Sequence, residues 1–136
     1  SVSVPGRTIL RMSTIPDRCS TTPELSNRAR GQWGEDLAAA HYRRLGHDIV
    51  DRNWRSATGE LDLVLFDGST YVFSEVKARR TADFGPASAA VTVAKQRRIR
   101  QLAVEWLRAN DVHAPSIRFD VVAITGTELE LITDAF

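Results

Sequence analysis

Residues 59–80, GELDLVLFDGSTYVFSEVKARR, place charged residues inside two apolar runs. Each run has the length and the alternation of a buried strand, and DGST between them is a turn sequence. The charged residues are Glu60, Asp62, Glu75 and Lys77. A charge among apolar neighbours costs several kcal/mol unless a partner compensates it. The segment therefore predicts a hairpin with one end reserved for charge.

The hairpin register places the four charges together. A four-residue loop over residues 67–70 pairs the strands so that facing residue numbers sum to 137. Asp62 then lies opposite Glu75, and Glu60 lies opposite Lys77. Because side chains alternate between the two faces of a strand, we expect all four on one face at one end of the hairpin.

Two facing carboxylates repel each other unless a cation lies between them. Carboxylate, carbonyl and water oxygens are the ligands that Mg²⁺ or Mn²⁺ prefers, so we predict one of these as cofactor. Lys77 follows Glu75 on the same face, where its ammonium can contact a phosphate. A local ion-pair cluster is the alternative, but pairing Glu60 with Lys77 leaves Asp62 facing Glu75.

Hydrophobic periodicity predicts an α/β fold with a mixed sheet. The expected order is helix, three strands, helix, two strands. The first three strands follow one another closely, which favours an antiparallel meander. The next connection passes through a helix, which favours a right-handed parallel crossover. The expected helices span 27–45 and 88–110, and the expected strands span 47–54, 60–66, 71–78, 116–125 and 128–133.

Length and composition suit one globular domain of 136 residues, 43% hydrophobic and 26% charged. Residues 1–25 carry three prolines among many serines and threonines, so we expect a flexible N-terminal tail before a folded domain over 26–136. The single cysteine, Cys19, excludes an internal disulfide and suggests a reducing, cytoplasmic setting. No apolar run approaches the roughly 18–20 residues of a membrane span, so we expect no membrane partner.

Charge is unevenly distributed on a chain of net charge +1. Residues 77–100 hold seven basic side chains against one acidic, whereas residues 101–136 hold two against six. A basic middle of this kind is either a surface that faces phosphates or a solvated helix face.

The motifs resemble those of a known family. Asp62, followed after twelve residues by Glu75-Val76-Lys77, resembles the D-(x)n-E-x-K core of the PD-(D/E)xK nuclease superfamily. The surrounding context resembles the YraN family of small bacterial proteins over about residues 31–124, in the stretches GQWGEDLAAAHYRRLG, RNWRSATGELDLVLFDG, VFSEVKARR, FGPASAAVTVAKQRRIRQLAVEWL and RFDVVAI. Two positions depart from the family pattern: Ser74 replaces an aliphatic residue, and Ala78 replaces threonine or another polar residue.

The resemblance implies a restriction-endonuclease-like core related to Holliday-junction resolvases. It implies that the carboxylates of Asp62 and Glu75 and the backbone carbonyl of Val76 bind the metal. Lys77 is then the lysine that orients or activates the attacking water. Glu35, on the first helix, resembles an extra acid that reaches the metal region in resolvase-like members; a solvent-facing helix acid is the alternative.

Several basic and polar residues near this site are candidates for contacts with nucleic acid. Lys95 falls within the apolar stripe of the second helix, so it either extends along the protein to solvent or reaches a phosphate. The full set of candidates is Arg79, Arg80, Lys95, Gln96, Arg98 and Arg100. Asp120, in the middle of an apolar strand, predicts a structural salt bridge.

Together these features predict a metal-dependent endonuclease that hydrolyses phosphodiester bonds in DNA, with branched or otherwise structured DNA among the expected substrates. Resolvase-like proteins often act as dimers, because symmetric cutting of two strands needs two sites, so we also expect a homodimer. The rival class is a non-catalytic module that binds nucleic acid with a nuclease-like fold. The intact set of Asp62, Glu75 and Lys77 favours the enzyme.

Overall fold

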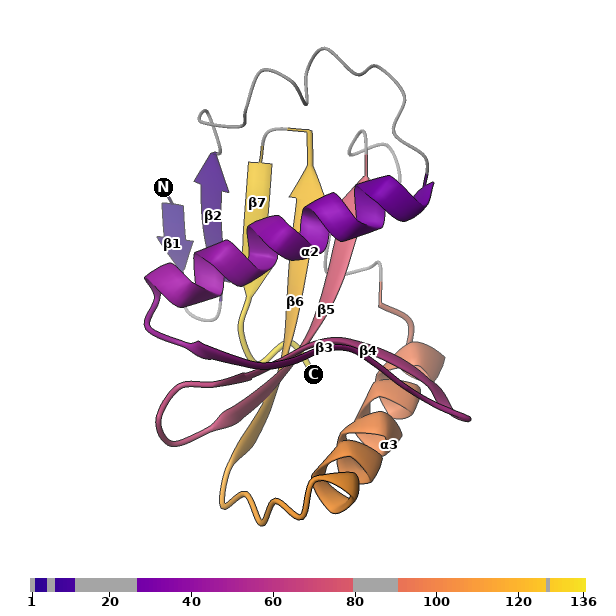
Figure 1. Cartoon of the computed structure of the whole chain (residues 1–136). Helices are drawn as coiled ribbons and strands as arrows, with labels where there is room; N and C mark the ends of the chain where they lie inside the picture. Colours follow the sequence, from indigo (N-terminus) through magenta and orange to yellow (C-terminus); the bar gives the residue numbers. More distant parts are fainter. Residues whose placement is uncertain (1, 5–6, 12–26, 80–90, 127) are drawn as a thin grey trace.

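The computed structural model describes residues 2–4, 7–11, 27–79, 91–126 and 128–136. Within these ranges the chain forms a seven-stranded mixed sheet with a helix against each face (Figure 1). The strand order is β1-β2-β7-β6-β5-β4-β3. The elements are β1 Val2–Val4, β2 Arg7–Arg11, α2 Asn27–Arg44, β3 Asp48–Ser56, β4 Gly59–Phe66, β5 Tyr71–Arg79, α3 Val93–Ala109, β6 Ile117–Thr125 and β7 Glu128–Ile132.

The connectivity confirms the predicted α/β fold. Strands β3, β4 and β5 form an antiparallel meander, and β5 lies parallel to β6 after the crossover through α3. Strand β7 returns antiparallel to β6. This helix–strand order is consistent with the restriction-endonuclease-like core that the resemblance implies. The sheet is strongly twisted, so that β3 and β4 cross the direction of β5, β6 and β7 (Figure 1).

The N-terminal segment differs from the flexible tail predicted for residues 1–25. Strand β2 pairs antiparallel with β7, and β1 pairs antiparallel with β2. The physical reason lies in the sheet, because without β2 the edge of β7 would present unpaired backbone groups. Residues 1, 5–6 and 12–26 of the predicted tail and its boundary lie outside the described residues.

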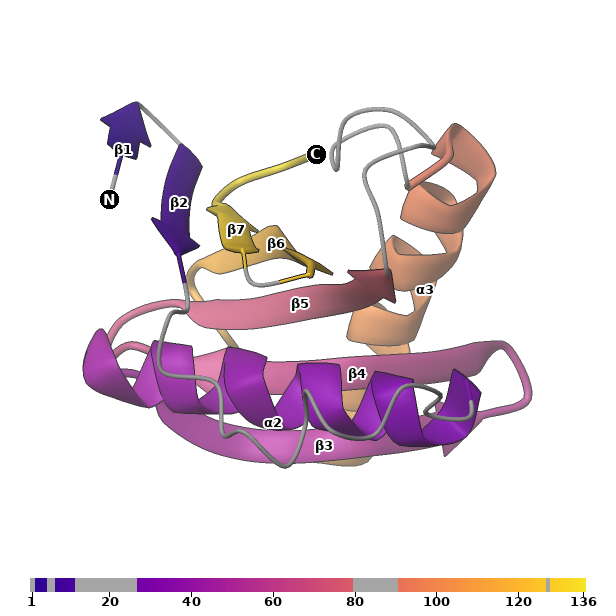
Figure 2. The ribbon, with the colours of Figure 1, turned by 90° about the horizontal axis from the view of Figure 1, so that it is seen from above.

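Helix α2 packs on the face of the sheet that carries Leu63, Leu65 and Val72. It crosses β5, β6 and β7 (Figure 1) and runs along the direction of β3 and β4 (Figure 2). A Cβ atom added to Gly34 would lie 2.9 Å from the Cβ of Ala78, so the helix approaches β5 closely at this turn. Ala78, one of the two departures from the family pattern, thus lies at this close contact. The same contact brings the next helical residue, Glu35, toward the sheet.

Helix α3 covers the opposite face, where Val64 and Phe73 point. Its buried residues, Ile99, Leu102, Ala103 and Trp106, follow the apolar stripe expected from the sequence. The helix begins at Val93, where Thr92 caps it by accepting a hydrogen bond from the Lys95 N–H; residues 88–90 of the predicted helix lie outside the described residues. No described helix is both long and apolar enough to cross a membrane.

Asp120 forms the predicted structural salt bridge. Its fully buried carboxylate accepts hydrogen bonds from Arg118 Nε at 2.8 Å and from the Tyr42 hydroxyl at 2.8 Å. The Asp134 N–H adds a third donor at 3.0 Å. The Tyr42 hydroxyl also lies 2.9 Å from the hydroxyl of Ser74. Ser74, the other departure from the family pattern, therefore belongs to this buried network.

Candidate metal centre and active site

The candidate site lies where β4 and β5 separate. Their ladder follows the predicted register from Phe66 and Tyr71 as far as Leu63 and Ser74, and it ends there. Beyond this point β4 remains paired with β3, and β5 remains paired with β6. Asp62 and Glu75 therefore do not form the predicted ladder pair, because the ladder ends one residue earlier, but the charge of Glu75 still acts on Asp62 and raises its pKa after burial does.

Asp62 occupies the opening between the two strands. Its Oδ2 accepts a hydrogen bond of 2.9 Å from the backbone N–H of Val76 on β5. A side-chain oxygen thus takes the place of the carbonyl that a continuing ladder would supply. The backbone N–H of Val76 forms this hydrogen bond with Asp62. The resemblance implied a different role for Val76, a metal contact through its backbone carbonyl.

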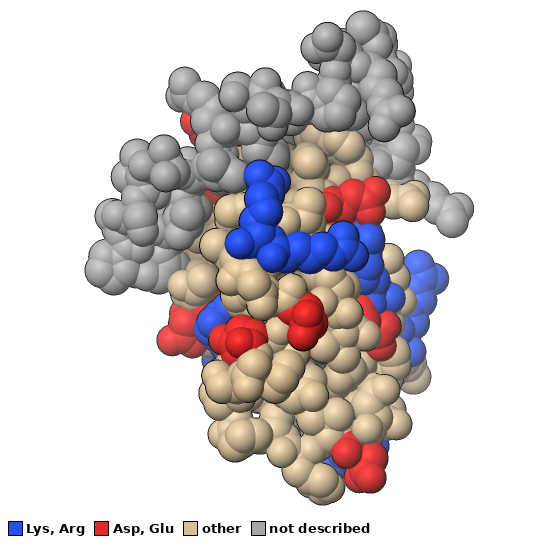
Figure 3. Space-filling view, turned by 60° about the vertical axis from the view of Figure 1, so that its left-hand side comes forward, with Lys and Arg blue, Asp and Glu red and all other residues tan. Residues whose placement is uncertain are grey.

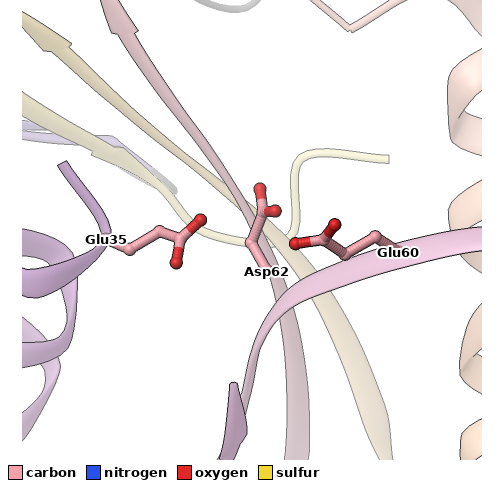
Figure 4. Close-up of side chains that lie close together, drawn as sticks. All are labelled: Glu35, Glu60 and Asp62. Atoms are coloured by element: carbon pink, nitrogen blue, oxygen red, sulfur yellow. The ribbon is translucent and has the colours of Figure 1, made fainter. Parts of the chain in front are cut away.

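Three carboxylates meet at this opening. Glu35 from α2 and Glu60 and Asp62 from β4 each offer an oxygen atom, and these atoms lie within 4.8 Å of one another. Figure 4 shows Glu35 and Glu60 approaching Asp62 from opposite sides. Glu35 therefore reaches the acidic cluster, as the resemblance implied. Glu60 was predicted to lie on the charged face but not to bind metal.

The donor set fits a hard divalent cation. All three groups supply carboxylate oxygens, which Mg²⁺ and Mn²⁺ prefer. Burial, and next the charge of Glu75, raise the pKa of Asp62 to about 8. Burial also raises the pKa of Glu35, although the Asn53 side chain and Arg52 oppose this shift. Burial and the neighbouring carboxylates thus disfavour the ionised forms of Asp62 and Glu35, and a cation bound between them would favour those forms.

Glu75 has a different partner from the one expected. Its carboxylate oxygen Oε1 lies 2.7 Å from Nζ of Lys95, and its side chain is only 9% exposed. Lys95 thus extends from α3 toward the sheet. Glu60 lies 3.0 Å from Arg55, its neighbour on β3, so the alternative pairing of Glu60 with Lys77 does not form.

The charges of Glu75 and Asp62 affect the pKa values of both Lys77 and Lys95. For Lys95, burial lowers the pKa, but the hydrogen bond and charge of Glu75 outweigh it, and the net pKa is raised. For Lys77, burial and next the nearby Lys95 lower the pKa, despite the charges of Glu75 and Asp62. Lys77 is thus a half-buried amine near the carboxylates of Glu75 and Asp62.

A cleft of about 260 Å³ opens beside the carboxylates, between the start of β4 and the first turns of α3. Charged groups lie around it and apolar side chains of α3 form part of its wall. It is lined by Gly59, Glu60, Asp62, Glu75, Lys95, Arg98, Ile99 and Leu102. Arg98 and Lys95, both predicted to contact nucleic acid, therefore lie beside the acids.

The other predicted nucleic-acid contacts are less well placed. Gln96 donates its side-chain N–H to the backbone carbonyl of Val91, just before α3. The guanidinium of Arg100 lies 4.9 Å from the ring centre of Phe119, so this exposed side chain stacks on an aromatic ring. The side chain of Arg79 and all of Arg80 lie outside the described residues. One face of the molecule carries a band of basic side chains among acidic ones (Figure 3).

Comparison with known proteins identifies the family. A model described as "Uncharacterised protein family UPF0102" matches residues 34–124. A UPF0102 protein of Rhodococcus opacus is 50% identical over 115 residues, covering 81% of this chain and 98% of the relative. A UPF0102 protein of Geobacter sulfurreducens is 48% identical over 115 residues, covering 81% of this chain and 90% of the relative. The chain belongs to the UPF0102 family, the YraN family that its motifs indicated.

Proposed function

We propose that this protein is a metal-dependent endonuclease that hydrolyses phosphodiester bonds in DNA. The observation that carries the proposal is the meeting of the Glu35, Glu60 and Asp62 carboxylates within 4.8 Å, beside Lys77 and the Glu75–Lys95 pair. Carboxylates that bind a cation, next to a partly buried lysine, are the groups that phosphodiester hydrolysis needs. Membership of UPF0102 agrees with the motif resemblance and names no activity of its own.

Each group has a separate role in this proposal. Mg²⁺ or Mn²⁺ held by Glu35, Glu60 and Asp62 would supply Lewis-acid chemistry at the scissile phosphate. The amine of Lys77 would orient the attacking water and stabilise charge on the phosphoryl oxygens. Burial, and next the nearby Lys95, lower the pKa of Lys77, so a larger fraction of its amine is neutral and available to accept a proton than in an exposed lysine.

The cleft limits how the substrate enters. A volume of about 260 Å³ suits the reacting phosphate and its immediate neighbours, whereas the rest of a duplex must lie outside. Arg98 lies at this cleft and is exposed, so it can contact a neighbouring phosphate. Such contacts give affinity without base specificity, which suits recognition of DNA shape, including branched or otherwise structured DNA. Cutting two strands symmetrically would require a homodimer.

The test is cleavage of labelled linear, flapped and four-way-junction DNA with Mg²⁺ or Mn²⁺. Wild type is compared with Asp62→Asn and Lys77→Met, and with Asp48→Asn as a control on the exposed part of β3. We expect wild type and the control to cut at least one substrate, and the two site variants to lose at least about 100-fold in rate. No cutting of any substrate, with equal DNA binding by all four proteins, would instead support the non-catalytic binding module.

A further inference from the structure

Lysine is rare in this chain, and both lysines lie near the acidic cluster. Of 18 basic residues, 16 are arginine, and the two lysines are Lys77 and Lys95. Both lie beside the acidic cluster and close enough to affect each other's pKa. Arginine presents a wide planar fork, whereas the lysine ammonium is a compact point charge with three donors. An ammonium is thus the side-chain group closest in size and charge distribution to a bound metal cation.

The ammonium of Lys95 forms an ion pair with the carboxylate of Glu75. The distance from Nζ to Oε1 is 2.7 Å, and the Glu75 side chain is 9% exposed. Glu75 is the acid that the resemblance marks as a metal ligand, yet the carboxylates that lie within 4.8 Å of one another belong to Glu35, Glu60 and Asp62. We propose that the ammonium of Lys95 takes the place of a second divalent cation at Glu75, so that each chain binds one cation. This inference rests on the proposed function, because it assumes a cation at the other three acids.

The local charge balance supports a single cation. Two arginines approach the cluster: Arg52 lies 3.9 Å from Glu35 and 2.7 Å from the adjacent Asp36, and Arg55 lies 3.0 Å from Glu60. The charged groups around the cluster and its cleft balance, with five acids against five basic side chains: Glu35, Asp36, Glu60, Asp62 and Glu75 against Arg52, Arg55, Lys77, Lys95 and Arg98. One divalent cation leaves the site with an excess charge of +2, suited to a phosphate diester, whereas two would leave +4 and repel the adjacent lysines.

The experiment counts bound Mn²⁺ by electron paramagnetic resonance of the free ion during titration of purified protein. Wild type is compared with Lys95→Met and Lys95→Gln, which remove the charge, and with Lys95→Arg, which keeps it. Arg97→Met is the matched control, because Arg97 is an exposed basic residue of the same helix outside the cleft lining. Thermal melts establish that each variant is folded.

We expect one Mn²⁺ per chain for wild type, Arg97→Met and Lys95→Arg, and two for a folded Lys95→Met or Lys95→Gln. Two Mn²⁺ in wild type would overturn the inference without any variant. One Mn²⁺ in folded variants without the charge would overturn it as well. No Mn²⁺ in wild type would overturn both this inference and the proposed cation site. The expected counts together with no DNA cleavage would leave the inference standing and remove the proposed nuclease function.

Discussion

Replacing Asp62 with asparagine is expected to stabilise the metal-free protein at alkaline pH, although Asp62 is the centre of the proposed site. The carbonyl oxygen of asparagine can still accept the 2.9 Å hydrogen bond from the Val76 N–H. What the change removes is a negative charge that is largely buried and faces the carboxylates of Glu75, Glu35 and Glu60. Removing an uncompensated buried charge favours the folded state.

The magnitude follows from the pKa of Asp62. Burial, and next the charge of Glu75, raise this pKa from 3.8 to about 8 in the folded protein. The folded state therefore binds the proton more tightly than the unfolded state, and stability falls as the pH rises between these two values. At about 1.4 kcal/mol for each pKa unit, the ceiling of the effect is about 6 kcal/mol. Because relaxation and water penetration reduce such penalties, we expect a gain of about 2–4 kcal/mol at pH 8.

Urea unfolding in the presence of a chelator measures this effect at pH 5 and pH 8. The gain in unfolding free energy for Asp62→Asn should be at least about 2 kcal/mol larger at pH 8 than at pH 5. Asp48→Asn, at an exposed position of β3, should change stability by less than about 0.5 kcal/mol at either pH. Added Mg²⁺ should stabilise wild type and not the Asp62 variant. An Asp62→Asn protein no more stable than wild type at pH 8 would refute this account of the site.

Three further predictions concern the scaffold. Burial lowers the pKa of His41, so the unfolding free energy of wild type should decrease as the pH falls below about 6.5. In urea titrations at pH 7.5 and 5.5, the unfolding free energy of His41→Gln should depend less on pH than that of wild type. Gly34→Ala should lower the unfolding free energy by about 1–3 kcal/mol, because the added Cβ would lie 2.9 Å from the Cβ of Ala78. Gly31→Ala is the control in the same assay: its added Cβ would have no atom within 4 Å, and the unfolding free energy should rise by about 0.5–1 kcal/mol. Asp120→Ala should lower the unfolding free energy by about 3–5 kcal/mol, since it strands a partly buried arginine, and a loss below 1 kcal/mol would contradict the network.

The alternation of apolar residues predicted the strands and their register, but the predicted register does not hold where β4 and β5 separate at the candidate site. Alternating apolar residues in β4 and β5 gave the correct register from Phe66 to Leu63, because each face of the hairpin packs on its own helix. Extending that register to Asp62 assumed a continuing ladder. The Asp62 carboxylate instead accepts the Val76 N–H, a competition between side chain and backbone that no periodic pattern reveals.

Contacts between the helices and the sheet were the second feature that the sequence could not predict. Local sequence marked Glu35 and Lys95 as candidates, but their partners depend on how α2 and α3 pack on the sheet. The pairing of Lys95 with Glu75 joins residues 20 positions apart from different layers. Glu60 could have been found as a candidate ligand from its place two residues before Asp62 on the same strand face. Strand β2 was missed because the need to cover β7 is a property of the assembled sheet.

Two partly or fully buried aspartates of this protein differ in how their charge is compensated, and the difference points to the function. Asp120 is surrounded by donors, with Arg118, the Tyr42 hydroxyl and the Asp134 N–H all within 3.0 Å. Asp62 accepts the Val76 N–H and otherwise faces further carboxylates, and burial and then these charges raise its pKa. A fold that needs a charge only for its own stability surrounds it with donors, as at Asp120. The end of the β4–β5 ladder brings acids from two elements to Asp62, and such an arrangement is stable with its charges intact when a cation binds there.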